Sequence, residues 1–123
     1  MRLVALSLLV GVFLASAAVA LAANPKRGGT YQGTKPGVVA KQLVLRVSKS
    51  GKSAYASLRC AGTLASTMNV PIHKGSFSGA KKTGSIVIWT LSGHFTSKTT
   101  ASAHAFLHAV CDGGNVNLTL TLV

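Results

Sequence analysis

Apolar and polar residues alternate along most of the chain after position 40. Between positions 43 and 47, and again between 54 and 60, every second residue is apolar or small. The same alternation recurs at positions 68–72, 87–95, 103–111 and 116–122. A period of two places alternate side chains on one face of a β-strand. The pattern therefore predicts a series of strands, each with one face turned to a core.

Turn-forming residues separate these segments at short intervals. The expected breaks are at positions 28–29, 34–37, 48–52, 73–75, 79–84 and 112–114. Short strands joined by tight links predict a single antiparallel all-β domain, either a sandwich or a barrel. Residues 101–110 could instead form a helix, because they contain four alanines and no glycine. Their neighbours are strands and they lack a clear cap, which favours a strand here too.

The first 22 residues have the features of a signal peptide. Arg2 provides a positive charge, residues 3–14 are mostly apolar, and Ala20-Leu21-Ala22 matches the small-x-small cleavage pattern. The alternative is an uncleaved anchor over residues 3–23. Cleavage after Ala22 would leave a mature domain of residues 23–123 with no further run long enough to span a bilayer. We therefore expect a protein that is secreted, either extracellular or associated with the cell envelope.

The two cysteines are expected to form one disulfide. Cys60 and Cys111 both lie in the predicted mature domain, and an even count in an exported chain is typical of an intramolecular bridge. Each falls on the apolar face of its predicted strand, so both thiols should point to the core. Their separation is too long for a Cys-x-x-Cys redox motif.

The composition is strongly basic. The chain carries 13 Lys and Arg against one acidic residue, Asp112, which gives a net charge of +12. One carboxylate cannot provide a glycosidase pair, a calcium cage or an aspartic dyad. Asp112 also precedes Gly113-Gly114, where a turn is the expected role. These observations favour a protein that is not an enzyme, without cofactors.

The order of several short motifs resembles that of a family of small secreted proteins of actinobacteria. The motifs include Gly-x-Tyr-x-Gly at 29–33, Gly-x-Phe-x-Gly at 75–79, Gly-x-Phe-x-Ser at 93–97 and Cys-Asp-Gly-Gly at 111–114. The resemblance covers about residues 28–123. The chain departs from it in the last strand, where family members often have Trp and this chain has Leu118-Thr119-Leu120. The resemblance implies an all-β secreted domain and no established activity.

The histidines provide the alternative, enzymatic hypothesis. On a helix, His104 and His108 would lie on one side at metal-ligand spacing, but on a strand they stand about 13 Å apart. The strand prediction therefore argues against a metal site. A small secreted hydrolase of ribonuclease type could use these two histidines with Lys98. A protein-binding module of the inhibitor kind is a further alternative. His73 and His94 are expected on the surface.

The excess of basic residues is the strongest indication of function. It should produce a positive potential that attracts anionic polymers such as cell-wall polymers and acidic polysaccharides. Aromatic residues are few, which argues against specific nucleic-acid recognition. The candidate anion-binding residues are those in the predicted turns, which strand geometry could gather at one end: Lys49, Lys52, Lys74, Lys81 and Lys82.

Overall fold

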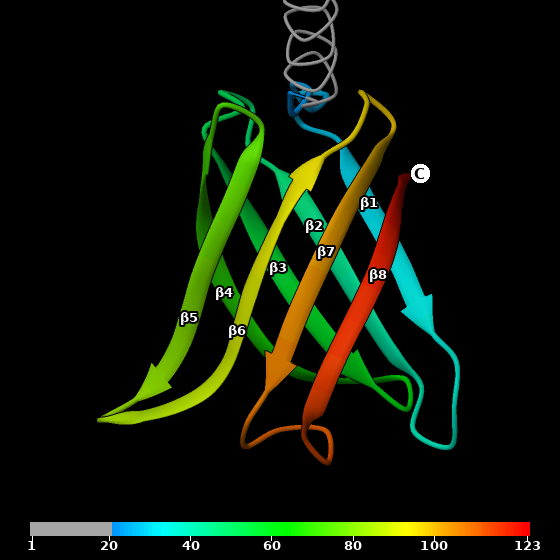
Figure 1. Ribbon diagram of the computed structural model, residues 1–123, viewed down its shortest axis with the longest axis vertical. Helices are drawn as coiled ribbons and strands as arrows, with labels where there is room; N and C mark the ends of the chain where they lie inside the picture. The colour runs from blue at the N-terminus through cyan, green and yellow to red at the C-terminus, as the bar shows by residue number, and fades with distance from the viewer. Residues whose placement is uncertain (1–20) are drawn as a thin grey trace, which may run out of the picture.

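The computed structural model describes residues 21–123, and within that range every regular element is a β-strand. The strands are β1 (Thr30–Lys35), β2 (Lys41–Val47), β3 (Ser53–Cys60), β4 (Thr63–His73), β5 (Ser76–Thr83), β6 (Ile86–Phe95), β7 (Thr100–Leu107) and β8 (Gly114–Leu122). Each strand is antiparallel to the next, and β1 also pairs with β8. The sheet therefore closes into a barrel (Figure 1). The all-β prediction is confirmed, in its barrel form.

The predicted signal peptide, residues 1–22, lies almost wholly outside the described residues. Within residues 21–123, no helix is long and apolar enough to cross a membrane.

The alternating strand directions sort the connections between two ends of the barrel (Figure 1). The upper end carries residues 21–29, the turns 48–52, 74–75 and 96–99, and Val123. The lower end carries the turns 36–40, 61–62, 84–85 and 108–113. Every second connection thus shares an end, and side chains distant in sequence are brought into one neighbourhood.

The barrel interior is filled by apolar side chains, as expected for eight strands. The residues of segment 43–47 that are predicted to share the inward face do so: Leu43 and Leu45 are fully buried, and Val47 nearly so. The largest fully buried side chains are Trp89, Tyr31 and Phe95. The ring of Phe95 packs edge-on against Tyr31 at a centroid distance of 5.0 Å. The buried apolar residues form a single core cluster, which makes the barrel a rigid support for its end loops.

Small residues on β6 and β7 make room for the aromatic rings. Gly93 pairs with Phe77 on one side and Ala103 on the other. A Cβ at position 93 would lie 2.6 Å from Cζ of Phe77 and 2.2 Å from the Ser102 carbonyl oxygen. Glycine is therefore required there by close approach of a ring and a neighbouring strand.

Residues 101–110, for which a helix is the alternative prediction, form a strand as far as Leu107. Its buried residues alternate with exposed ones over Thr100–Leu107, and Ala101, Ala103 and Ala105 point inward. The pairing of this strand with β6 and β8 satisfies its backbone groups. Tertiary pairing thus decides the structure of an alanine-rich segment whose local propensity favours a helix.

The disulfide between Cys60 and Cys111 is present, as predicted. It joins the end of β3 to the turn that links β7 to β8, with a Cα–Cα distance of 5.9 Å. The alternation over 103–111 predicts a strand that reaches Cys111, and this part of the prediction is wrong. Strand β7 ends at Leu107, and Cys111 lies in the turn that follows.

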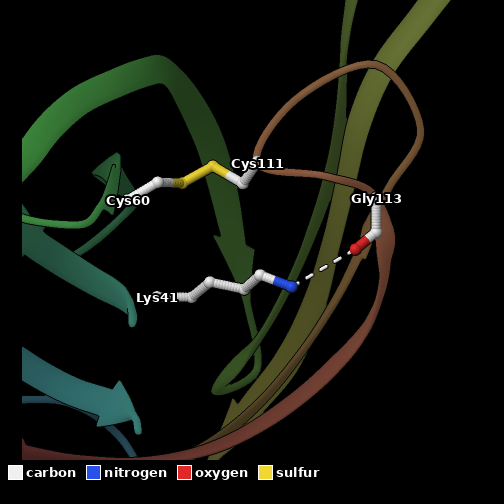
Figure 2. Close-up of a disulfide and its surroundings, with 4 residues drawn as sticks. All are labelled: Lys41, Cys60, Cys111 and Gly113. Carbon is white, nitrogen blue, oxygen red and sulfur yellow. Dashed lines mark hydrogen bonds between the residues drawn. A yellow bond between two sulfur atoms is a disulfide. The ribbon is translucent and has the colours of Figure 1, made fainter. Parts of the chain in front are cut away.

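A hydrogen bond reinforces the bridge. The amine of Lys41 donates to the carbonyl oxygen of Gly113 in the same turn, at 3.2 Å. Figure 2 shows the disulfide and this hydrogen bond side by side. The lower-end turn 108–113 is therefore fixed to both β2 and β3 across the barrel.

The predicted break at 79–84 is wrong for most of its length. Strand β5 continues to Thr83, so the turn begins only at Gly84. Gly79 lies within the strand, where a Cβ would come within 2.8 Å of a methyl group of Val70. This glycine serves a close approach between β5 and β4 and does not end the strand.

Strands β4 and β5 are joined by a short ladder. Their paired residues are Ile72–Phe77 and His73–Ser76, both near the upper end. Toward the lower end these two strands have no ladder partner in each other, although β5 stays paired with β6 as far as Thr83. We call this part of the barrel the β4–β5 gap.

Candidate anion-binding site

The five predicted anion-binding lysines do not form one cluster. Lys49 and Lys52 lie in the turn between β2 and β3, and Lys74 lies in the turn before β5, so these three share the upper end. Lys81 and Lys82 are near the far end of β5, at the lower end. Because β5 runs the full height of the barrel, it separates Lys74 from the other two.

Three basic residues outside the predicted set complete the upper-end group. Lys26 and Arg27 lie in the segment before β1, and Lys98 lies in the turn between β6 and β7. The order and direction of the strands decide which turns share an end. This order cannot be predicted from the sequence pattern alone, so these three residues could not be assigned to the site. We call the resulting set the upper basic cluster: Lys26, Arg27, Lys49, Lys52, Lys74 and Lys98.

The upper basic cluster has no acidic side chain beside it to neutralise its charge. The one acidic residue of the chain, Asp112, lies in the turn between β7 and β8 at the lower end. All six side chains of the cluster are exposed. Like charges held together without acidic neighbours create a positive potential that draws polyanions.

A buried tyrosine fixes two of the loops that carry this charge. The Tyr31 hydroxyl donates a hydrogen bond to the carbonyl oxygen of Lys98 at 2.5 Å. The hydroxyl oxygen of Tyr31 in turn accepts a hydrogen bond from the backbone N–H of Lys26 at 2.8 Å. Since Tyr31 is completely buried in the barrel, the backbones of Lys26 and Lys98 are anchored to the core. Their side chains can therefore bind a ligand with little loop ordering.

Backbone hydrogen bonds attach the N-terminal segment to the turn between β2 and β3. The N–H of Gly28 donates to the carbonyl of Ser48 at 3.1 Å, and Val47 donates to Gly29 at 2.8 Å. The same segment and turn line a hollow of about 300 Å³, formed by Asn24, Pro25, Arg27, Ser50 and Gly51. Arg27 thus lies in a concave surface that also carries amide and hydroxyl groups, which suits an oxyanion group.

A second hollow lies on the barrel wall beside the upper end. It has a volume of about 330 Å³ and is lined by Pro71, His73, Ser76, Phe77, Ser78, Ser92 and Gly93. His73 is exposed, as predicted, and directly precedes Lys74. The three hydroxyls and the imidazole provide neutral hydrogen-bonding groups next to the charged loops.

The structure separates the residues of the hydrolase hypothesis along β7. Lys98 precedes this strand at the upper end, His104 lies in its middle, and His108 follows its lower end. An extended strand of this length places Lys98 and His108 about 30 Å apart. The three groups therefore do not meet at one reacting centre.

The histidines have ordinary surface contacts. A ring nitrogen of His104 lies 3.1 Å from the side-chain oxygen of Asn115, and the His108 ring centroid lies 4.2 Å from that of Phe106. His94 is exposed, as predicted. Among residues 21–123, no group of three or more potential ligands is arranged to hold a metal ion.

Comparison with protein-family models, with curated proteins and with solved structures finds no match to this chain.

Proposed function

We propose that the protein is a secreted, non-enzymatic binding or structural protein that attaches to anionic polymers of the cell envelope or its surroundings through the upper basic cluster. The observation that carries this proposal is the presence of six basic and no acidic side chains on the upper-end loops described above. Acidic polysaccharides and phosphate-rich wall polymers are the ligands that such a surface would attract.

The location of the aromatic residues favours attachment through charge over recognition of bases. Tyr31, Phe77, Trp89 and Phe95 are buried in the core. The exposed Phe106 lies near the lower end of β7, whereas Tyr55, which is 41% exposed, lies near the upper end of β3, three residues after Lys52. Proteins that read single-stranded nucleic acids combine exposed aromatic rings with basic groups on one surface. Among the described residues, Tyr55 is the one large exposed ring near the upper basic cluster, which therefore lacks a surface of several rings on which successive bases could stack.

A disulfide and an exported location support each other in this proposal. Bridges between cysteines persist in oxidising compartments, and Cys60–Cys111 ties the end of β3 to a distant turn. A rigid, bridged barrel suits a protein that must last outside the cell. Membership of the actinobacterial secreted family remains part of the proposal.

The test compares two variants of equal charge. In the upper variant Lys49, Lys52, Lys74 and Lys98 are replaced by Gln; in the lower variant Lys35, Arg59, Lys81 and Lys82 are replaced by Gln. Binding to a heparin-like polysaccharide and to a purified wall teichoic acid is measured by titration. Each variant loses four charges, so a loss confined to the upper variant identifies the site and not merely the net charge.

The upper variant should lose most of the binding, while the lower variant should retain most of it. The logarithm of the affinity of the unmodified protein should fall linearly with the logarithm of salt concentration, since binding releases counterions. Equal losses in the two variants, or binding that persists in molar salt, would refute the proposal.

A further inference from the structure

The lower end of the barrel exposes apolar side chains on three separate connections. Val38 lies in the turn between β1 and β2 and is fully exposed. Leu64 lies at the start of β4, just after the next lower turn, and is 52% exposed; Ile86 begins β6 after the third and is 61% exposed. These three connections all lie at the lower end in Figure 1. Single exposed apolar residues are common, but three on one end form a repeated feature.

The upper end differs in chemistry from the lower end. The three turns that link strands there carry Lys, Ser, Thr and Gly, with no large apolar residue among 48–52, 74–75 and 96–99. The upper-end turns are therefore polar and basic, and the exposed aliphatic residues of that end, Leu21 and Val123, lie outside them, whereas at the lower end large aliphatic side chains lie in or directly beside the turns. Tight turns form readily with polar residues, so turn geometry does not require Val38, while Leu64 and Ile86 lie at the starts of their strands.

A basic residue accompanies each exposed aliphatic side chain. Arg59 is the cross-strand partner of Leu64 in the β3–β4 ladder. Lys82 directly precedes Thr83, the partner of Ile86. Lys35 ends β1 just before the turn that contains Val38. Aliphatic side chains surrounded by Lys and Arg suit the boundary of an anionic bilayer, where the apolar groups enter the acyl region and the cations stay among the phosphates.

Two of the four lower-end turns, 61–62 and 108–113, are also held in fixed positions. The disulfide ties the end of β3 to turn 108–113, and Lys41 ties β2 to the same turn through Gly113 (Figure 2). The Arg59 guanidinium donates a hydrogen bond to the Gly62 carbonyl at 2.7 Å, within the turn before Leu64. Pre-ordered turns lose little conformational freedom when they bind a surface.

From these observations we propose that the lower end docks on the surface of anionic lipid bilayers, with Val38, Leu64 and Ile86 inserted among the lipids. The spacing of the three side chains over separate turns favours a bilayer as the occupant, because a fluid surface accepts separate insertion points without a matching shape. The docked barrel would direct its upper basic cluster away from the membrane. The proposal uses other residues than the polymer site and does not depend on it.

The experiment measures partition onto vesicles of phosphatidylglycerol and phosphatidylcholine in equal parts, with phosphatidylcholine vesicles as reference. In the lower apolar variant Val38, Leu64 and Ile86 are replaced by Ser. In the control variant the exposed residues Tyr55 and Val123, which lie toward the upper end, are replaced by Ser. Both sets are exposed, so the stability of the fold should change little.

The lower apolar variant should bind the anionic vesicles about tenfold less tightly or weaker, because it loses three inserted side chains. The control variant should change by less than about twofold. Part of the binding of the unmodified protein should survive about 0.5 M salt, where electrostatic attraction is strongly screened. The upper variant with four Gln residues should keep this salt-resistant part, which separates lipid docking from polymer binding.

Two single substitutions add independent readouts. An Ile86→Trp variant should show a blue-shifted emission component when anionic vesicles are added, against the constant background of the buried Trp89. An Asp112→Asn variant, which removes the one acidic side chain of the lower end, should bind anionic vesicles more tightly.

Three results would overturn the proposal. They are equal losses of binding in the lower apolar and control variants, an emission of the Ile86→Trp variant that does not shift with vesicles, and no binding of the unmodified protein to anionic vesicles.

Discussion

The hydroxyl of Tyr31 donates a hydrogen bond to the carbonyl of Lys98, which lies 67 residues further along the chain. Tyr31 belongs to the first strand and Lys98 to the turn before the seventh. The alternating strand directions put the start of β1 and the turn 96–99 at one end, and the closure between β1 and β8 brings them close to each other. A core residue thus sets the position of a surface loop that carries charge.

Replacing Tyr31 by Phe should weaken both folding and polymer binding without changing the charge. The variant leaves the Lys98 carbonyl and the Lys26 N–H without their shared partner, which should cost about 1–3 kcal/mol of unfolding free energy. Affinity for the heparin-like polysaccharide should fall about twofold to fivefold, since the two loops must then be ordered on binding. Chemical denaturation and titration measure the two effects.

Tyr55→Phe is the matched control for this substitution. The Tyr55 side chain is 41% exposed and lies on the barrel wall. Its variant should retain the stability of the unmodified protein within about 0.5 kcal/mol. A Tyr31→Phe variant as stable as this control would contradict the role assigned to the Tyr31 hydroxyl.

Gly93→Ala should destabilise the barrel strongly. The added methyl group would collide with the Phe77 ring and with the Ser102 carbonyl, and overpacking of this kind costs about 1–3 kcal/mol or more. Gly37→Ala serves as the control, since its Cβ would meet its nearest neighbour, the Val39 carbonyl, at 4.0 Å. Thermal unfolding of the two variants compares them directly, and equal melting temperatures would argue against the packing described for β6.

The strand faces could be predicted from sequence because burial has the same period as the strand itself. In β7, for example, Ala101, Ala103 and Ala105 alternate with exposed residues, and this period of two prevails over a helix-favouring composition. Both cysteines could be paired because two of them, in a chain expected to be exported, leave one intramolecular partner each. These conclusions need no knowledge of which strands are neighbours.

The composition of the candidate site could not be predicted in the same way. Lys74 and Lys81 are seven positions apart, yet they belong to opposite ends because β5 lies between the turn and Lys81. Lys26 and Lys98 are far apart in sequence, yet they share Tyr31. Strand order and direction decide both cases, and a period-two pattern is equally compatible with a sandwich, in which other turns would share an end.

The predicted break at 79–84 shows a different limit. Glycine and lysine are typical of turns, so the composition of this segment favours a break. In the structure Gly79 makes room for Val70 of the neighbouring strand, a contact between residues whose alignment no local pattern reveals. Composition alone does not distinguish a glycine that turns the chain from one that admits a neighbour.

The disulfide should make a measurable contribution to stability. The natively folded protein should contain no thiol that reacts with an alkylating agent, since Cys60 and Cys111 are bonded to each other. Their replacement by Ser should cost about 2–4 kcal/mol of unfolding free energy, because the bridge closes a long loop in the unfolded chain. Mass spectrometry after alkylation tests the first expectation and denaturant titration the second. Two modified cysteines in the non-reduced native protein would contradict the assignment.

The β4–β5 gap should be a weakly protected part of the barrel wall, together with the seam between β1 and β8, where the ladder also has two residue pairs. The ladder between β4 and β5 has two residue pairs, whereas that between β6 and β7 has seven. Backbone amides that face the gap lack a strand partner across it and should exchange through small local openings. Hydrogen exchange followed by NMR should therefore be faster for the amides of β5 that point toward β4 than for those of β7.

The amides of β5 that bond to β6 provide the internal control for this experiment. They belong to the same strand but to a ladder that runs from Ser76 to Thr83, so they should exchange slowly. Alternation between fast and slow amides along β5 is the expected signature, because successive N–H groups of a strand point to opposite neighbours. Uniformly slow exchange along β5 would show instead that β4 and β5 pair over their whole length.

The open edge of β5 should also be a site of self-association that Lys82 opposes. Exposed strand edges invite pairing between molecules, and charged residues such as Lys82 oppose it. Replacing Lys82 by Val should therefore increase self-association, measured by sedimentation.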